Sequence, residues 1–194
     1  MNPIDRLTEA FEKFPGIGPR QARRFVQYLL SAAPNLRADM AEQIKALGAN
    51  TSQCTECYRW FVGKSGLCAV CGNSSRDAAT LFVIEKDADI DNVERSGYKG
   101  RYFVLGGTIP LGSEEPVKHI RLRELKKRIA ENGLTEIILG LSATTEGDHT
   151  RQLLQETLKD TGLTISSLGR GLSTGSELEY ADPDTIASAL NSRN

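Results

Sequence analysis

Four cysteines in the first half of the chain have the clearest capacity for chemistry, and they are all the cysteines in the sequence. They form two Cys-x-x-Cys pairs separated by ten residues: Cys54, Cys57, Cys68 and Cys71. Two such pairs can direct four thiolates at one centre, which is the tetrahedral sulfur set that a zinc ion prefers. Four sulfur atoms also leave no position for water or substrate. We therefore predict one structural zinc ion per chain.

The same cysteines could instead form two disulfides or a redox-active dithiol. Disulfides persist mainly in oxidising compartments, and the sequence opens with Met-Asn-Pro-Ile-Asp-Arg, which does not have the pattern of a secretory signal. A reducing cytoplasm fits better. The zinc interpretation is therefore favoured.

Three acidic residues are candidates for docking a partner or for a possible Mg²⁺ site. Glu85 follows one apolar run, and Glu146 and Asp148 follow another, within the segment from Ser142 to Asp148. Mg²⁺ prefers such hard anionic oxygens. Glu85 is equally compatible with an ordinary exposed carboxylate at a strand end, and the sequence leaves open whether Mg²⁺ binds here.

Basic residues are concentrated in the amino-terminal third of the chain. The segment from Lys13 to Ala38 contains five basic residues and no acidic one. Within it, Gly-Ile-Gly separates an expected helix carrying Ile4, Leu7 and Phe11 from one that begins at Pro19. The amino end of a helix can bind phosphate through its free N–H groups. The DNA-binding candidates are Gly16, Gly18, Arg20, Arg23 and Arg24, although many helical hairpins bind nothing.

Overall charge limits how nucleic acid could bind. The net charge is −1, which excludes a protein coated in positive charge, so any such contact must come from local patches. A second basic run, from Lys118 to Arg128, is interrupted only by Glu124. This run is the alternative DNA contact if the hairpin is not one.

The pattern of the sequence changes near Thr80, where the helices of the amino-terminal third give way to strands that alternate with helices. Apolar, β-rich runs and helical patterns then follow one another, which predicts an α/β domain with a mostly parallel sheet and ligands at the carboxyl ends of its strands. The expected strands are 80–84, 101–105, 136–141 and 164–168, and the expected helices are 89–95, 117–131, 149–159 and one starting at Asp182-Pro183.

Two features of the first 78 residues are expected to serve packing. A third helix should run from an Asn35 cap to Gly48 and pack through Leu36, Met40, Ile44 and Leu47. Trp60 and Phe61 should form a small plug under the metal, with base stacking as the alternative.

The composition is typical of a soluble globular protein. Its 194 residues are 39% hydrophobic and 25% charged, and no apolar run approaches the roughly 20 residues of a membrane span. We expect a cytoplasmic protein without membrane contact.

The motifs and their order resemble the RecR family of bacterial recombination mediators. The hairpin around Gly16 and Gly18 resembles a helix-hairpin-helix motif, and Glu85 with Gly147 matches the toprim domain of topoisomerases, primases and some nucleases. The tail from Gly169 to Asp182 adds a long and distinctive string. The resemblance covers residues 4–190 and implies four parts: a hairpin module at 1–52, a four-cysteine zinc finger at 53–78, a toprim-like domain at 79–173 and a tail with a helix at 174–194.

This resemblance implies a non-enzymatic protein that binds DNA without regard to sequence. With RecO, and in some bacteria RecF, it would load recombinase onto single-stranded or gapped DNA coated by single-strand-binding protein. Family members form rings, so a homotetramer is expected. The alternative is a Mg²⁺-dependent enzyme of phosphodiester bonds, but Ser142 and Thr144 occupy the two toprim aspartate positions. Residues 107–124 also differ from the family's glycine-rich loop, so the resemblance does not extend to how this loop is built or how it binds a partner.

Overall fold

The computed structural model describes residues 1–64, 66–130 and 133–191. These residues fall into two compact units, Met1–Thr51 and Ser52–Asn194. Each unit is described by itself. The division into four parts stays a prediction, because compactness alone does not separate the finger and tail from the sheet.

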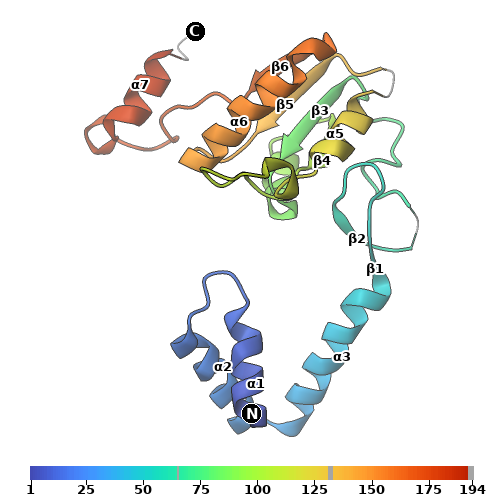
Figure 1. Ribbon diagram of the computed structural model, residues 1–194, viewed down its shortest axis with the longest axis vertical. Helices are drawn as coiled ribbons and strands as arrows, with labels where there is room; N and C mark the ends of the chain where they lie inside the picture. The colour runs from blue at the N-terminus through green and yellow to red at the C-terminus, as the bar shows by residue number, and fades with distance from the viewer. Residues whose placement is uncertain (65, 131–132, 192–194) are drawn as a thin grey trace. The chain divides into compact units, whose positions relative to one another are not determined.

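The Met1–Thr51 unit consists of three helices, each with a proline in its first turn (Figure 1). Helices α1 (Pro3–Glu12) and α2 (Pro19–Ser31) pack together as the expected hairpin, and α3 (Pro34–Asn50) follows. Phe11 and Phe25 meet edge to face across the hairpin, with ring centroids 5.7 Å apart. The tight turn requires a left-handed backbone at Gly16, where φ is +76° and a side chain would be strained.

Helix α3 differs from its predicted bounds at both ends. It begins at Pro34 with Ala33 as its N-cap, and it continues past Gly48 to Asn50. The start is fixed by proline's restricted φ and by Arg37, whose Nη1 donates to the carbonyls of Leu29 (2.7 Å) and Ala32 (2.9 Å). The asparagine cap was therefore wrong.

The expected packing of α3 was wrong for three of its four apolar residues, since only Leu36 is half-buried. Met40, Ile44 and Leu47 are 37%, 65% and 63% exposed. Among the described residues of this unit, Ala22 and Val26 are the buried ones. The three helices therefore leave much of their apolar surface uncovered.

The Ser52–Asn194 unit is built on a four-stranded, wholly parallel sheet, as the alternating pattern predicted. Its strand order is β4-β3-β5-β6, and Val83 of β3 pairs with Phe103 of β4 and Leu139 of β5. Each strand lies within one residue of its predicted bounds: β3 (Thr80–Ile84), β4 (Arg101–Val104), β5 (Glu136–Gly140) and β6 (Thr164–Ser167).

Both faces of the sheet are covered, because successive side chains of a strand point to opposite faces. Leu81 and Val83 belong to a core with helices α5 (Leu122–Ile129) and α6 (Thr145–Leu158). Phe82 and Ile84 belong to a second core with α4 (Ile90–Arg95).

Three predicted helices of this unit have adjusted bounds. A 3₁₀ turn, η1 (Asp87–Asp89), precedes α4, and another, η2 (Pro116–Lys118), is separate from α5. The predicted end of that helix at Glu131 lies outside the described residues. Helix α6 starts at Thr145, four residues early, because Thr144 caps it: its Oγ1 accepts the Gly147 N–H at 3.1 Å.

The remaining elements are short. Strands β1 (Thr51–Gln53) and β2 (Trp60–Val62) pair beside the cysteines. The 3₁₀ turns η3 (Lys159–Thr161) and η4 (Leu178–Tyr180) follow α6 and precede α7 (Pro183–Asn191). Asp182 caps α7 as predicted, accepting the Thr185 N–H at 2.8 Å. No helix in the described part of the chain is both long and apolar enough to cross a membrane.

Candidate metal centre and nucleic-acid interface

The four cysteines come together at one buried point. All four are free thiols, each at most 5% exposed, and their sulfur atoms lie within 4.8 Å of one another. Cys57 Sγ and Cys68 Sγ are 3.6 Å apart. Four sulfurs placed tetrahedrally at about 2.3 Å from a zinc ion would be about 3.8 Å apart. The cluster therefore has the size of a metal site, and the distances do not correspond to disulfides.

Backbone turns at the two Cys-x-x-Cys pairs create this arrangement. The Tyr58 N–H donates to the Cys54 carbonyl at 3.0 Å, and the Gly72 N–H donates to the Cys68 carbonyl at 2.9 Å. Tyr58 has a left-handed φ of 62°, the one described non-glycine residue with positive φ. The Cys68 N–H also points at Cys54 Sγ, 3.4 Å away. The turns thus aim sulfur atoms at a common centre.

Hydrogen bonds among the cysteines shift the thiol pKa values in opposite directions: those of Cys57 and Cys71 are raised, and that of Cys68 is lowered, foremost by its hydrogen bond with Cys57. The pKa of Cys57 is raised by its hydrogen bond with Cys68, and the pKa of Cys71 is raised by its hydrogen bonds with Cys57 and Cys68; burial adds to both shifts. A soft divalent cation at the centre would stabilise the thiolates instead. The donor set, its burial and its spacing therefore fit a tightly held metal ion.

The two aromatic residues of the finger have different roles. Phe61 packs against the cysteine cluster, as the plug prediction has it. Trp60 does not: it is 58% exposed, and the exposed Val62 lies on the same face of β2. Strand β2 has three residues, which is too few for an alternating pattern in the sequence to show that Phe61 is packed and Trp60 is exposed.

At the carboxyl end of β3, Glu85 is buried rather than exposed. It is 7% exposed, and Oε2 accepts hydrogen bonds from the Ser142 N–H (3.2 Å) and from the Ser142 hydroxyl. Ser142, in place of a toprim aspartate, therefore binds the neighbouring glutamate. The alternative of an ordinary exposed strand-end carboxylate is wrong.

Two further positions of the toprim motif, Thr144 and Gly147, have local structural roles. Thr144, at the second aspartate position, is the N-cap of α6. Gly147 is needed for close packing, since a Cβ there would lie 2.1 Å from the Ser142 carbonyl oxygen. The motif therefore persists here as a turn that joins β5 to α6.

Asp148 and Glu146 lie on the first turn of α6 with different partners. Asp148 accepts hydrogen bonds from Arg170 and Arg151, and Arg170 foremost holds the pKa of this carboxyl below its usual range. Glu146 is exposed, with Oε2 3.4 Å from the Thr108 hydroxyl. Sequence analysis missed the role of Arg170, since nothing in the spacing links positions 148 and 170.

The carboxylate oxygens of Glu85, Glu146 and Asp148 do not all lie within 4.8 Å of one another. In residues 1–64, 66–130 and 133–191, the cysteine set is the one group of three or more potential ligands close enough to hold a single ion. The structure thus brings together the four predicted sulfur ligands, whereas it gives the three carboxylates separate hydrogen-bond partners.

At the hairpin, the amino end of α2 is open. Gly18 is its N-cap, and no side chain caps the helix. Within the described residues, the N–H groups of Arg20 and Gln21 have no hydrogen-bond acceptor. Arg20, Arg23 and Arg24 are exposed, while Arg37 is occupied with carbonyl groups. Free N–H donors beside arginines suit an anion.

Comparisons with known proteins give matches to the same family at both ends of the chain and over nearly its whole length. Family models match residues 4–47 (RecR, helix-hairpin-helix), 79–169 (Toprim domain) and 171–194 (RecR, C-terminal). The chain is 36% identical over 191 residues to Recombination protein RecR of Jannaschia sp. (strain CCS1), covering 98% of this chain and 95% of that protein. It is 38% identical over 192 residues to Recombination protein RecR of Chloroflexus aurantiacus, covering 98% and 93%.

The cysteine cluster yields the first testable prediction. Cys57→Ser should lose one bound zinc ion per chain and become protease-sensitive, because metal binding to such sites carries about 10–16 kcal/mol of apparent folding free energy. Native mass spectrometry and limited proteolysis measure both. Ser74→Ala, an exposed change close to the cluster, is the control. A metal-free wild-type chain that remained folded and protease-resistant would contradict the prediction.

Proposed function

The chain belongs to the RecR family of recombination proteins, and from that premise we propose that it is a DNA-binding mediator of recombinational repair. In this proposal it acts with RecO, and in some bacteria RecF, to load recombinase onto single-stranded or gapped DNA coated by single-strand-binding protein. Such work places it at the nucleoid. The single observation that carries the proposal is the open, arginine-flanked amino end of α2 in a chain of this family.

The chemistry of the hairpin supports a contact with the DNA backbone. A phosphate oxygen can accept the free N–H groups at the start of α2, and the positive end of the helix dipole adds to the charge of Arg20, Arg23 and Arg24. The left-handed turn at Gly16 precedes Gly18, the N-cap of α2. Backbone N–H groups and arginines at phosphates carry no base information, so the binding is independent of sequence.

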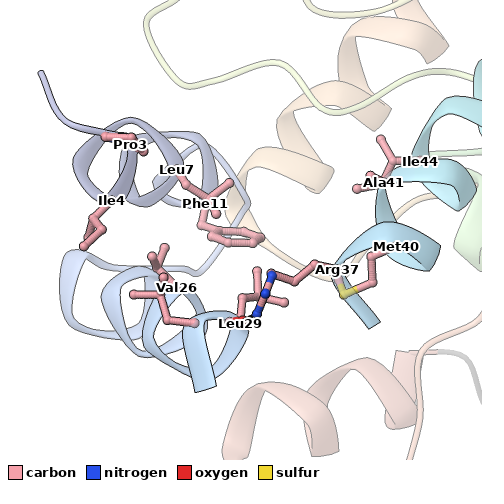
Figure 2. Close-up of a pocket in the computed structure, with 11 residues that line it drawn as sticks. Pro3, Ile4, Leu7, Phe11, Val26, Leu29, Arg37, Met40, Ala41 and Ile44 are labelled. Atoms are coloured by element: carbon pink, nitrogen blue, oxygen red, sulfur yellow. Dashed lines mark hydrogen bonds between the residues drawn. The ribbon is translucent and has the colours of Figure 1, made fainter. Parts of the chain in front are cut away.

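Useful affinity requires several hairpins, and the uncovered apolar surface of the Met1–Thr51 unit supports assembly. A groove of about 340 Å³ lies among α1, α2 and α3. Figure 2 shows its lining, with Leu7 and Phe11 from α1, Leu29 from α2, and Met40 and Ile44 from α3. We propose that the occupant is the same unit of a second copy. In a ring tetramer, several weak phosphate contacts then act on one strand.

The metal in this proposal is zinc, and its role is structural. Four buried thiolates are a soft donor set with no open position, which zinc satisfies with four-coordinate geometry. Cys54, Cys57, Cys68 and Cys71 would hold it.

The toprim-like region is proposed to be non-catalytic. Phosphodiester chemistry at such sites relies on Mg²⁺ held by several carboxylates. Here Glu85 is bound to Ser142, and Asp148 is paired with Arg170 and Arg151. Glu146 is the most accessible carboxylate of the three, so it would be the main docking point for a basic surface of RecO. Glu85 and Asp148 are less exposed and would contribute less to this docking.

The second prediction tests the hairpin. The double change Arg20→Glu, Arg24→Glu should weaken binding to single-stranded DNA at least about 10-fold near 0.1 M salt. It should lower the slope of log affinity against log salt by about 1.4, because each neutralised phosphate contributes about 0.7. Fluorescence anisotropy across a salt titration measures both quantities.

Two controls sharpen this experiment. Arg95→Glu, Lys99→Glu makes the same change in net charge at exposed positions of the other unit, and it should bind DNA like the parent. Sedimentation velocity should show the same assembly for all three proteins. If the hairpin variant binds as well as the parent at every salt concentration, the hairpin is not the DNA contact.

The third prediction is that purified protein with Mg²⁺ neither nicks nor relaxes supercoiled plasmid DNA. The physical reason is that three carboxylates with separate partners cannot fix a metal ion at the phosphodiester. Agarose gel electrophoresis measures the outcome, and Glu179→Ala serves as the control for an exposed carboxylate elsewhere. Mg²⁺-dependent cleavage that is retained in Glu179→Ala but absent in Glu85→Ala would show a genuine enzyme and reject the proposal.

A further inference from the structure

A cationic surface on the Ser52–Asn194 unit has no role in the function proposed above. Helix α5 buries Leu122 and Leu125 in the core and exposes Arg123, Lys126 and Lys127. The spacings of three and four residues place these three cations on one face of the helix. The loop before the helix adds more, and we call the set the α5 cationic face: Lys118, His119, Arg121, Arg123, Lys126 and Lys127.

An open cavity of about 590 Å³ lies at one end of this face. Its charged lining consists of three cations (Lys118, Arg121 and Arg123) and two carboxylates (Glu115 and Glu124), with His119 beside them. Lys118 and Glu115 form an ion pair with each other. The lining therefore has an excess of one positive charge with His119 neutral, and Lys126 and Lys127 raise this excess on the next turn of α5.

The exposed cations of α5 are available to a ligand. Among the described residues, Arg123, Lys126 and Lys127 take part in no ion pair. Arg121 is held in place at the cavity: its Nη1 donates to the Val104 carbonyl at 2.9 Å, and its guanidinium lies 5.6 Å from the centre of the Tyr58 ring. A fixed guanidinium beside exposed lysines is suited to binding an anionic chain along the helix.

We propose that the α5 cationic face is a second binding site for the phosphate backbone of DNA, separate from the hairpin. The inference rests on the proposed function, since it takes DNA as the ligand. An acidic protein segment would present the same sign of charge. However, protein interfaces are centred on apolar or aromatic anchors, and Val117 is the one exposed large apolar side chain among the described residues lining the cavity. Charge without an apolar anchor favours nucleic acid.

Lysine footprinting on the chain without substitutions tests the location directly. Acetylation of Lys118, Lys126 and Lys127, followed by mass spectrometry, should slow at least about threefold when oligo-dT is added. Acetylation of Lys99 and Lys159, which lie off this face, should not change. Unchanged reactivity of all three face lysines at saturating DNA would overturn the proposal. Protection by polyglutamate but not by DNA would assign the face to an acidic protein segment and also overturn it.

A matched pair of variants measures the contribution to affinity. Arg123→Glu, Lys127→Glu should weaken oligo-dT binding about 10-fold and lower the salt slope by about 1.4, while Arg95→Glu, Lys99→Glu should bind like the parent. Normal affinity in the first variant, together with lost affinity in Arg20→Glu, Arg24→Glu, would reject the α5 site and leave the proposed function standing. Normal affinity in both would reject the α5 site and the hairpin contact together.

Discussion

The convergence of four cysteine sulfurs on one point is the constraint on which the Ser52–Asn194 unit depends. The turns around Cys54 and Cys68 have little core of their own, so the finger keeps its shape through the sulfur centre. That centre also fixes the finger to the sheet. The Val104 N–H donates to the Cys57 carbonyl at 2.8 Å, the Trp60 N–H donates to Asp87 Oδ1 at 3.1 Å, and Tyr58 packs edge to face on Phe103, with ring centroids 5.4 Å apart. The finger therefore completes the edge of the sheet beside β4.

Through these contacts the finger also organises the charges of the neighbouring surface. Glu56 lies between Arg101 of β4 and Arg128 of α5, at 3.5 and 3.9 Å. Arg128 is almost fully buried, and a buried cation is stable only with such a partner. At the start of α5, the guanidinium of Arg121 instead lies over the Tyr58 ring, 5.6 Å from its centroid. Two cations of this region, Arg121 and Arg128, thus contact residues of the finger. The remaining cations of α5 are exposed to solvent. One helix therefore serves both packing and the proposed binding to DNA.

Those parts of this structure that depend on local pattern could be predicted from sequence. Apolar runs alternating with helical patterns predicted the parallel sheet, and the Cys-x-x-Cys spacing located the metal ligands. Three features could not be predicted, for physical reasons. The exposure of Ile44 and Leu47 depends on what covers α3, which an amphipathic pattern does not reveal. The hydrogen bonds of Glu85 with Ser142 and of Asp148 with Arg170 join residues distant in sequence, and only the folded sheet brings them together.

Hydrogen exchange with and without metal tests most directly whether the sulfur centre organises the finger and the sheet edge. Removal of the metal by a chelator, followed by deuterium labelling and mass spectrometry, should expose amides in residues 52–72 and at Val104, whose N–H is bonded to the Cys57 carbonyl. Helix α6 and strand β6 contribute no described residue to the cysteine cluster and should keep their protection. Unchanged exchange in residues 52–72 and at Val104 after complete loss of the metal would contradict this account.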